Sequence, residues 1–212
     1  MLRCFEDLAS ALAPQRCPGC GGRGDPLCPE CLGALTPPPP AAPPAGIERW
    51  SAAYAYTGAA REIIARVKYR NARAALPWIA TATHAAAVVL GPSDVVTWVP
   101  TTARRRRARG FDHAELLARR VAQMAGHRAV ATLDRLDDCA QTDRVGAVRR
   151  GGPRLSVRGP AGIAGWRILV VDDVATTGAS LSSAAGALRV AGAREVVAAT
   201  FARTPLRPAG PA

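Results

Sequence analysis

Two hydrophobic periodicities alternate along this chain, and each predicts a different kind of element. Residues 2–13 space their apolar side chains three and four apart, which predicts a short helix that docks on the main body or binds a partner. From residue 50 onward, short apolar runs typical of strands alternate with helical spacings. We predict strands at 50–56, 94–99, 129–133, 168–171 and 195–201, and helices at 59–69, 77–90, 111–124 and 181–191. This alternation predicts an α/β fold with a doubly wound parallel sheet, covered by helices on both faces.

A proline-rich stretch at residues 36–46 predicts an extended, semi-rigid linker. It separates an accessory unit at 1–35, made of the N-terminal helix and a cysteine cluster, from a main domain at 47–204. The last residues, 205–212, are again rich in proline and are expected to be frayed.

Charge narrows the class of partner. The formal net charge is +12, which favours polyanions: phosphate groups, nucleic acid or an anionic membrane surface. Lys68 is the only lysine among the 28 basic residues, so part of this charge reflects a coding preference for arginine. No stretch approaches the roughly 20 apolar residues of a membrane span, and no secretory signal is visible, so we expect a cytoplasmic protein.

The strand predicted at 168–171 runs directly into Asp172 and Asp173, followed by a small, hydroxyl-rich turn at 176–180 and a helix. Ligands of doubly wound sheets bind outside the carboxyl ends of strands, and a helix N-terminus holds phosphate well. Carboxylates do not attract phosphate, but they suit ribose hydroxyls or a Mg²⁺ ion on a polyphosphate. The structural alternative is a plain strand-to-helix turn capped by an aspartate.

Two other functional classes with acidic residues after an apolar strand are excluded by the lysine content. P-loop NTPases need a glycine-rich loop ending in lysine and a hydroxyl residue, but Lys68 is followed by Tyr69. Receiver-type phosphoacceptor domains need a lysine after the acceptor strand, and none follows residue 173.

The segment 168–180 resembles the phosphoribosyl pyrophosphate signature of type I phosphoribosyltransferases, with Ala175 in place of a larger aliphatic residue. Over residues 17–204 the chain resembles the ComF family, a branch of that fold linked to competence for DNA uptake. Besides the cysteine cluster, the resemblance rests on the segments 67–70, 109–118 and 141–142. By this resemblance, phosphoribosyl pyrophosphate binds Asp172, Asp173, Val174, Ala175, Thr176, Thr177, Gly178, Ala179 and Ser180, together with Thr101 and Thr102.

A run of arginines, 104–107 and 109, follows Pro100 and is expected to form a loop at the same sheet edge as the aspartates. The resemblance makes the turn at 100–103 a pyrophosphate-binding loop, where Arg104 and Arg105 stabilise the leaving pyrophosphate. A solvated basic face and a nucleic-acid patch are the alternatives, although Phe111 is the only aromatic residue nearby for base stacking. Asp112 and His113 stand where the family has Asn-Gln, and we expect His113 on the surface of a helix.

Two further segments are expected to cover the ligand. By resemblance, Lys68, Tyr69 and Arg70 belong to a hood over the acceptor, although a single surviving lysine also fits chance. Residues 137–153 form a long polar segment, expected to be either a lid or a tethering loop. The family's Gln-Thr pair is present in it as Gln141 and Thr142.

Four cysteines stand in two C-x-x-C pairs, at Cys17, Cys20, Cys28 and Cys31. This spacing predicts one structural, tetrahedral Zn²⁺ site with no open position for catalysis. Two disulfides or a redox pair are the alternatives. Cys4 and Cys139 are expected to be unligated thiols.

The resemblance therefore implies an enzyme that binds phosphoribosyl pyrophosphate with Mg²⁺, using Asp172, Asp173, Arg104, Arg105 and Lys68. It would transfer the phosphoribosyl group to an unidentified acceptor and release pyrophosphate, with a role in nucleoside metabolism. Two other functions stay open: a sensor that binds the same ligand without turnover, and a factor that handles single-stranded DNA during uptake.

Overall fold

Four strands form a parallel sheet at the centre of the computed structural model, which describes residues 16–69, 73–136, 152–159 and 162–205. The strands are β1 (Arg49–Ala55), β2 (Val95–Trp98), β5 (Arg167–Ala175) and β6 (Glu195–Arg203). They lie in the order β1-β6-β5-β2, and all three pairings are parallel. The predicted α/β class with a parallel sheet is confirmed.

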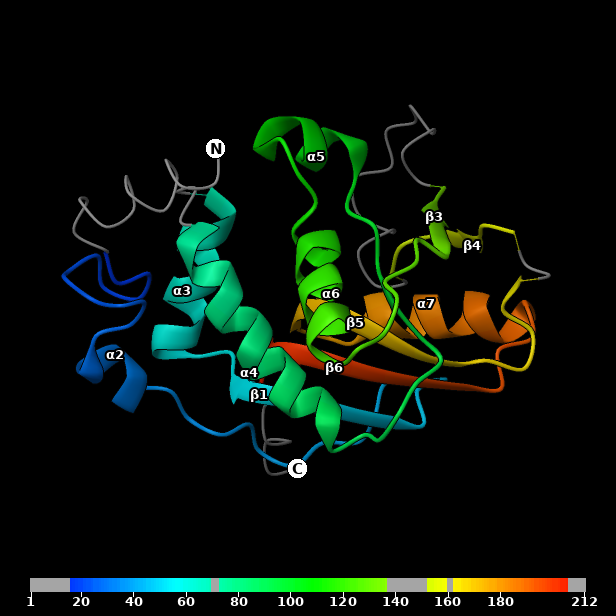
Figure 1. The fold of residues 1–212 in the computed structure, drawn as a ribbon, viewed down its shortest axis with the longest axis horizontal. Coiled ribbons are helices and arrows are strands. Elements are labelled where there is room, and N and C mark those ends of the chain that lie inside the picture. The colour runs from blue at the N-terminus through cyan, green and yellow to red at the C-terminus, as the bar shows by residue number, and fades with distance from the viewer. Residues whose placement is uncertain (1–15, 70–72, 137–151, 160–161, 206–212) are drawn as a thin grey trace, which may run out of the picture.

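Side chains of successive strand residues point to opposite faces, so each strand contributes to two cores. In β6, Val197, Ala199 and Phe201 join one core, while Val196 and Ala198 join the other. The first core is covered by α3 (Gly58–Tyr69), α4 (Leu76–Val88) and α6 (His113–Met124), and the second by α7 (Ala179–Val190). Figure 1 shows α4 and α6 crossing the near face of the sheet. Helices on both faces make the sheet doubly wound, as predicted.

Smaller elements complete the described part of the chain. They are α2 (Pro29–Gly33) in the cysteine cluster, the 3₁₀ turn η1 (Arg73–Ala75), α5 (Ala103–Arg109), and the hairpin of β3 (Leu133–Arg135) with β4 (Leu155–Val157). Within the described residues, no helix is both long and apolar enough to cross a membrane.

Two predicted elements differ from the structure. Residues 129–133 do not form a fifth sheet strand: Ala129 makes one isolated bridge to Val96, and the chain then leaves for the β3–β4 hairpin. The arginine run is not a loop but helix α5. The Thr102 side chain caps it by accepting a hydrogen bond from the Arg105 backbone N–H, and Gly110 ends it in the left-handed conformation at φ 78°.

Several predictions fall outside the described residues. They are the helix at 2–13, the thiols Cys4 and Cys139, Arg70 of the hood, the Gln141–Thr142 pair with most of segment 137–153, and most of the C-terminal tail.

Candidate functional site

Asp172 and Asp173 belong to strand β5 itself, near its carboxyl end, because β5 continues to Ala175. The Asp173 carboxylate forms an ion pair with Lys68 of α3, whose Nζ lies 2.8 Å from Oδ1 and 2.7 Å from Oδ2. Lys68 and Asp173 are only 21% and 13% exposed in their side chains. Asp172 Oδ1 accepts a hydrogen bond of 2.8 Å from the Asp173 backbone N–H. The structure thus brings together three predicted site residues from two distant segments.

Burial and charged neighbours set the electrostatic state of Asp172 and of Lys68. Burial and the neighbouring Asp173 charge raise the pKa of Asp172 to about 7, against the lowering effect of Lys68. Burial acts to lower the pKa of Lys68, but the charges of Asp173 and Asp172 outweigh it, so this pKa is raised overall. Lys68 therefore stays an ammonium ion, whereas Asp172 is poised to gain or lose a proton near neutral pH. A cation or a hydroxyl donor at Asp172 would favour its ionised form.

A cavity of about 250 Å³ opens over the acidic pair. Seven segments line it: the end of α3, the turn after β2, helix α5, the start of α6, strand β3, the end of β5 and the start of α7. Its polar lining residues include Lys68, Thr101, Arg105, Arg109, Asp112, Arg135, Asp172, Asp173 and Ser180. Parallel strands place their carboxyl ends at one sheet edge, which is why these segments meet there.

Asp112 fixes the turn after β2 against α6. Its buried carboxylate accepts hydrogen bonds from the backbone N–H groups of Thr101 at 2.8 Å, Ala114 at 3.0 Å and Glu115 at 3.4 Å. Burial raises the pKa of Asp112, although these N–H groups oppose the rise. The prediction for His113 is wrong: it is only 5% exposed, and its ring packs edge-on against Phe111 at 4.5 Å between centroids. His113 and the next residue, Ala114, lie on the side of α6 that faces the core.

In the predicted phosphate-binding turn, the threonines are exposed to solvent and the glycine is covered by another segment. Thr176 and Thr177 are exposed, and the Thr177 hydroxyl accepts a hydrogen bond of 3.3 Å from the Ala179 backbone N–H. Gly178 precedes α7 with φ 76°, and a Cβ built on it would lie 2.8 Å from Pro44 Cγ. The proline-rich linker therefore packs on the turn, a contact that no local sequence pattern predicts.

Of the turn, Val174 and Ser180 line the 250 Å³ cavity, while Ala175, Thr176, Thr177, Gly178 and Ala179 are not among its lining residues. A second cavity of about 920 Å³ adjoins the first, because both are lined by Lys68, Tyr69, Arg105, Arg109 and Arg135. Two predicted residues, Thr102 and Arg104, line this second cavity rather than the first. Sequence reasoning missed Arg135, which reaches the site from β3 and donates a hydrogen bond of 3.2 Å to the Pro100 carbonyl.

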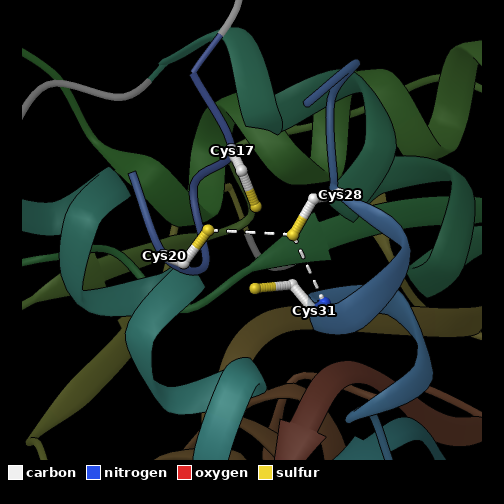
Figure 2. A group of neighbouring side chains, drawn as sticks. All are labelled: Cys17, Cys20, Cys28 and Cys31. Carbon is white, nitrogen blue, oxygen red and sulfur yellow. Dashed lines mark hydrogen bonds between the residues drawn. The ribbon is translucent and has the colours of Figure 1, made fainter. Parts of the chain in front are cut away.

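The four described cysteines converge on one point, as Figure 2 shows. One ligand atom from each lies within 4.8 Å of all the others, and none is in a disulfide. Tetrahedral Zn–S bonds of 2.3 Å put two sulfurs roughly 3.8 Å apart. The Cys20 and Cys28 sulfurs are 3.7 Å apart, which fits a shared metal and is far too long for a disulfide bond.

Backbone geometry also suits thiolates here. The N–H groups of Gly19, Gly22 and Cys31 donate to the sulfurs of Cys17, Cys20 and Cys28 at 3.4 to 3.5 Å. Burial acts to raise the pKa of Cys17, but backbone N–H groups outweigh it and bring this pKa to about 6, whereas burial and the neighbouring cysteines raise the pKa of Cys31. The convergence of the four sulfurs means that these cysteines could bind a structural Zn²⁺ ion through sulfur alone.

The cysteine cluster, residues 17–31, docks on the helix that carries Lys68. Cys17, Leu27 and Cys28 belong to the same core as Ile64 of α3. Two residues before Lys68, the Arg66 guanidinium donates a hydrogen bond of 3.2 Å to the Cys20 carbonyl. The cluster thereby supports α3 at its C-terminal end, next to the ion pair.

Comparison with known proteins yields fold-level similarity only. No protein-family model and no curated protein matches the sequence. A solved structure described as the allosteric regulatory enzyme of purine biosynthesis is similar, with a TM-score of 0.44 and 22% identity over 61% of this chain and 26% of that chain. Glutamine phosphoribosylpyrophosphate amidotransferase from B. subtilis, complexed with ADP and GMP, has a TM-score of 0.42 and 22% identity over 60% and 26%. The chain thus spans about a quarter of each structure, and scores this low carry no argument about its function.

Proposed function

We propose that this chain binds phosphoribosyl pyrophosphate with Mg²⁺ at the carboxyl edge of the sheet and transfers the phosphoribosyl group to an acceptor. The observation that carries the proposal is the Lys68–Asp173 ion pair beside Asp172, in a cavity also lined by Thr101 and Ser180. Carboxylates, hydroxyls and cations at one strand end suit a ligand that has hydroxyl groups and phosphates on one sugar.

Each part of the ligand has a matching set of groups. The 5′-phosphate would lie at the N-terminus of α7, on its backbone N–H groups and the hydroxyls of Thr176, Thr177 and Ser180. The ribose hydroxyls would donate to Asp172 and Asp173. Both carboxylates are also hard oxygen ligands that would hold a Mg²⁺ ion, and such an ion would neutralise part of the pyrophosphate charge.

In the reaction, the bond between ribose C1 and a pyrophosphate oxygen breaks, and its electron pair leaves with pyrophosphate. A lone pair of the acceptor forms the new bond to C1, and the acceptor loses one proton to solvent. Arg104, Arg105 and Lys68 supply fixed positive charge where the pyrophosphate charge grows. The Lys68 ammonium needs no reorganisation, because Asp173 already holds it in place.

The cysteine cluster supports this site from a distance. We infer that it holds a structural Zn²⁺ ion and keeps α3 in position through the contact between Arg66 and Cys20. With four sulfur ligands, the metal has no open position, so no chemical step is assigned to it.

Calorimetric titration of the Mg²⁺ complex of phosphoribosyl pyrophosphate tests the binding. We expect Asp173→Asn to weaken binding at least tenfold, since it removes a charge from the ion pair and one ligand contact. Asp134→Asn is the matched control, because this exposed carboxylate pairs with Arg158 on the hairpin. Equal affinity in wild type and Asp173→Asn contradicts the proposed site.

Pyrophosphate release, screened over pools of nucleophilic acceptors, then separates an enzyme from a sensor. Release that depends on one acceptor supports transfer. Tight binding without release for any acceptor supports the sensor instead.

A further inference from the structure

Polar contacts hold the last turn of helix α3 from two sides. Arg66 and Lys68 are two positions apart, and a step of two residues turns by about 200° around a helix axis. The Lys68 ammonium pairs with Asp173, whereas the Arg66 guanidinium donates a hydrogen bond of 3.2 Å to the Cys20 carbonyl. The end of α3 therefore connects the cysteine cluster to the acidic site.

The Arg66 contact depends on the shape of the turn that carries Cys20. Gly21 has φ 84°, and a Cβ built on it would lie 3.0 Å from Arg66 Nη1, so the missing side chain leaves room for the guanidinium. The Gly21 backbone N–H closes the turn by donating to the Cys17 carbonyl at 2.8 Å. Any movement of Cys20 would therefore move the carbonyl that holds Arg66.

Cys20 is the cysteine of the cluster that a reagent in solvent reaches most easily. It is exposed and Cys31 is half-buried, whereas Cys17 and Cys28 are only 1% and 7% exposed. Its sulfur lies 3.7 Å from the Cys28 sulfur, and the four thiols of the cluster form no disulfide. Because a disulfide needs about 2.05 Å between its sulfurs, a small shift of the Cys20 turn would let the pair join.

We propose that Cys20 and Cys28 form a redox-sensitive modification site whose oxidant is a hydroperoxide. Formation of their disulfide moves the Cys20 turn, breaks the contact with Arg66 and loosens the end of α3. Lys68 then leaves Asp173 more often, and ligand binding at the acidic site weakens. The effect on the ligand rests on the proposed function, but the oxidation and the release of Lys68 do not.

The reaction consumes one peroxide for each disulfide. The Cys20 sulfur attacks a peroxide oxygen, the O–O bond breaks, and the leaving hydroxide takes a proton to become water. The Cys28 sulfur then attacks the Cys20 sulfur, the S–S bond forms, and the second oxygen leaves as water. Two electrons pass from the sulfurs to the peroxide, and the two protons come from the thiols, or from solvent when the sulfurs are thiolates. Oxidation also removes two of the four ligands of a bound Zn²⁺ ion.

Lys68 is the only lysine of the chain, which makes it a specific reporter. Its amine is labelled with acetic anhydride, and mass spectrometry of peptides separates this label from the N-terminus. An ammonium held by a carboxylate reacts slowly, so the labelling rate measures how often Lys68 leaves Asp173. The proteins are wild type, Arg66→Gln and the control Arg61→Gln, which makes the same change in charge at an exposed position of α3.

Each protein is labelled before and after one equivalent of hydrogen peroxide. We expect peroxide to speed labelling about threefold to tenfold in wild type and in Arg61→Gln, as for the loss of one hydrogen bond near the surface. Arg66→Gln should label at the faster rate from the start and change little with peroxide. Peptide mapping should show Cys20 linked to Cys28, and dithiothreitol with Zn²⁺ should restore slow labelling in wild type.

Three results overturn the proposal. The first is a linkage other than Cys20 to Cys28, or no disulfide in the cluster at all. The second is formation of this disulfide with no change in the labelling of Lys68. The third is equal acceleration by peroxide in wild type and in Arg66→Gln, because Arg66 would then not carry the change to Lys68.

Failure of the proposed function would look different. Phosphoribosyl pyrophosphate with Mg²⁺ is titrated into the reduced and the oxidised wild type by calorimetry, and weaker binding after oxidation supports the whole proposal. No binding to the reduced protein refutes the proposed function, while the labelling of Lys68 still decides the redox site. Equal binding to both forms, together with faster labelling, refutes control of the ligand by oxidation.

Discussion

Replacement of Asp172 by asparagine should stabilise the ligand-free protein, and the gain should grow with pH. The folded-state pKa of about 7 lies above the ordinary value of 3.8. Below pH 3.8 the carboxyl is protonated in both the folded and the unfolded chain, and its full contribution to stability is present. This contribution is lost as the pH rises toward 7, because the unfolded chain ionises Asp172 first. Asparagine is uncharged, keeps the shape, and still accepts the Asp173 backbone N–H bond.

The magnitude follows from the difference between these two pKa values. A difference of about 3 units, at about 1.4 kcal/mol each, costs the wild type about 4 kcal/mol above pH 7. At pH 5 the carboxyl is ionised in the unfolded chain but still protonated in the folded one, so the cost is about 2 kcal/mol. We expect Asp172→Asn to recover these amounts, which correspond to a rise of roughly 10 °C in Tm at pH 8.

Urea unfolding at pH 5 and pH 8 measures both values. Asp134→Asn is the control, because the Arg158 pair lowers the pKa of Asp134 and its neutralisation should destabilise the protein slightly. A loss of stability in Asp172→Asn, or a gain that does not grow between pH 5 and pH 8, would refute the reasoning from burial and repulsion. The same variant should bind phosphoribosyl pyrophosphate more weakly, since stability is exchanged for function at such sites.

Three further variants test other parts of the molecule. Lys68→Met leaves the partly buried Asp173 carboxylate unpaired and should cost about 1–3 kcal/mol in urea unfolding, less in an Asp173→Asn background; strict additivity would contradict the pair. Gly178→Ala should lose about 1–3 kcal/mol of stability from strain at φ 76° and from contact with the linker. Gly186→Ala, which lies inside α7 with open space around it, should instead gain about 0.5–1 kcal/mol. Cys20→Ser should lower both the zinc content, measured by metal analysis, and Tm; purified protein with no zinc and no titratable thiols would point to disulfides instead.

The α/β class could be predicted because the apolar runs in the sequence coincide with the strands that are buried in the sheet. Residues 168–171 form a continuous apolar run, and β5 is buried on both faces by helices, so burial and sequence carry the same information. The sheet order and the hairpin could not be predicted. Residues 129–133 have an apolar pattern, but only Ala129 reaches the sheet before the chain turns away.

Helix α5 shows a signal that sequence reasoning passed over. The five arginines after Pro100 are predicted to form a loop, yet Thr102 before them and Gly110 after them are helix boundary residues. Arginine is itself a good helix former, and the two boundary residues add to this preference. The segment therefore forms a helix despite the repulsion between its positive charges.

The sequence predicts the acidic pair of the candidate site, but not the contacts that this pair and its neighbours make with distant segments. Lys68 and Asp173 are 105 positions apart, and no local pattern specifies their ion pair. The same holds for Pro44 on Gly178 and for Arg135 at the cavity, since each depends on packing between distant segments.

Thermal stability in the presence of phosphoribosyl pyrophosphate and Mg²⁺ tests the central proposal most directly, with wild type and Asp173→Asn compared. A ligand at about 100 times its dissociation constant should stabilise the folded wild type by about 2.7 kcal/mol, which raises Tm by several degrees. The account predicts this rise in wild type and its loss in Asp173→Asn. No rise in either protein at millimolar ligand would contradict it, and so would an equal rise in both.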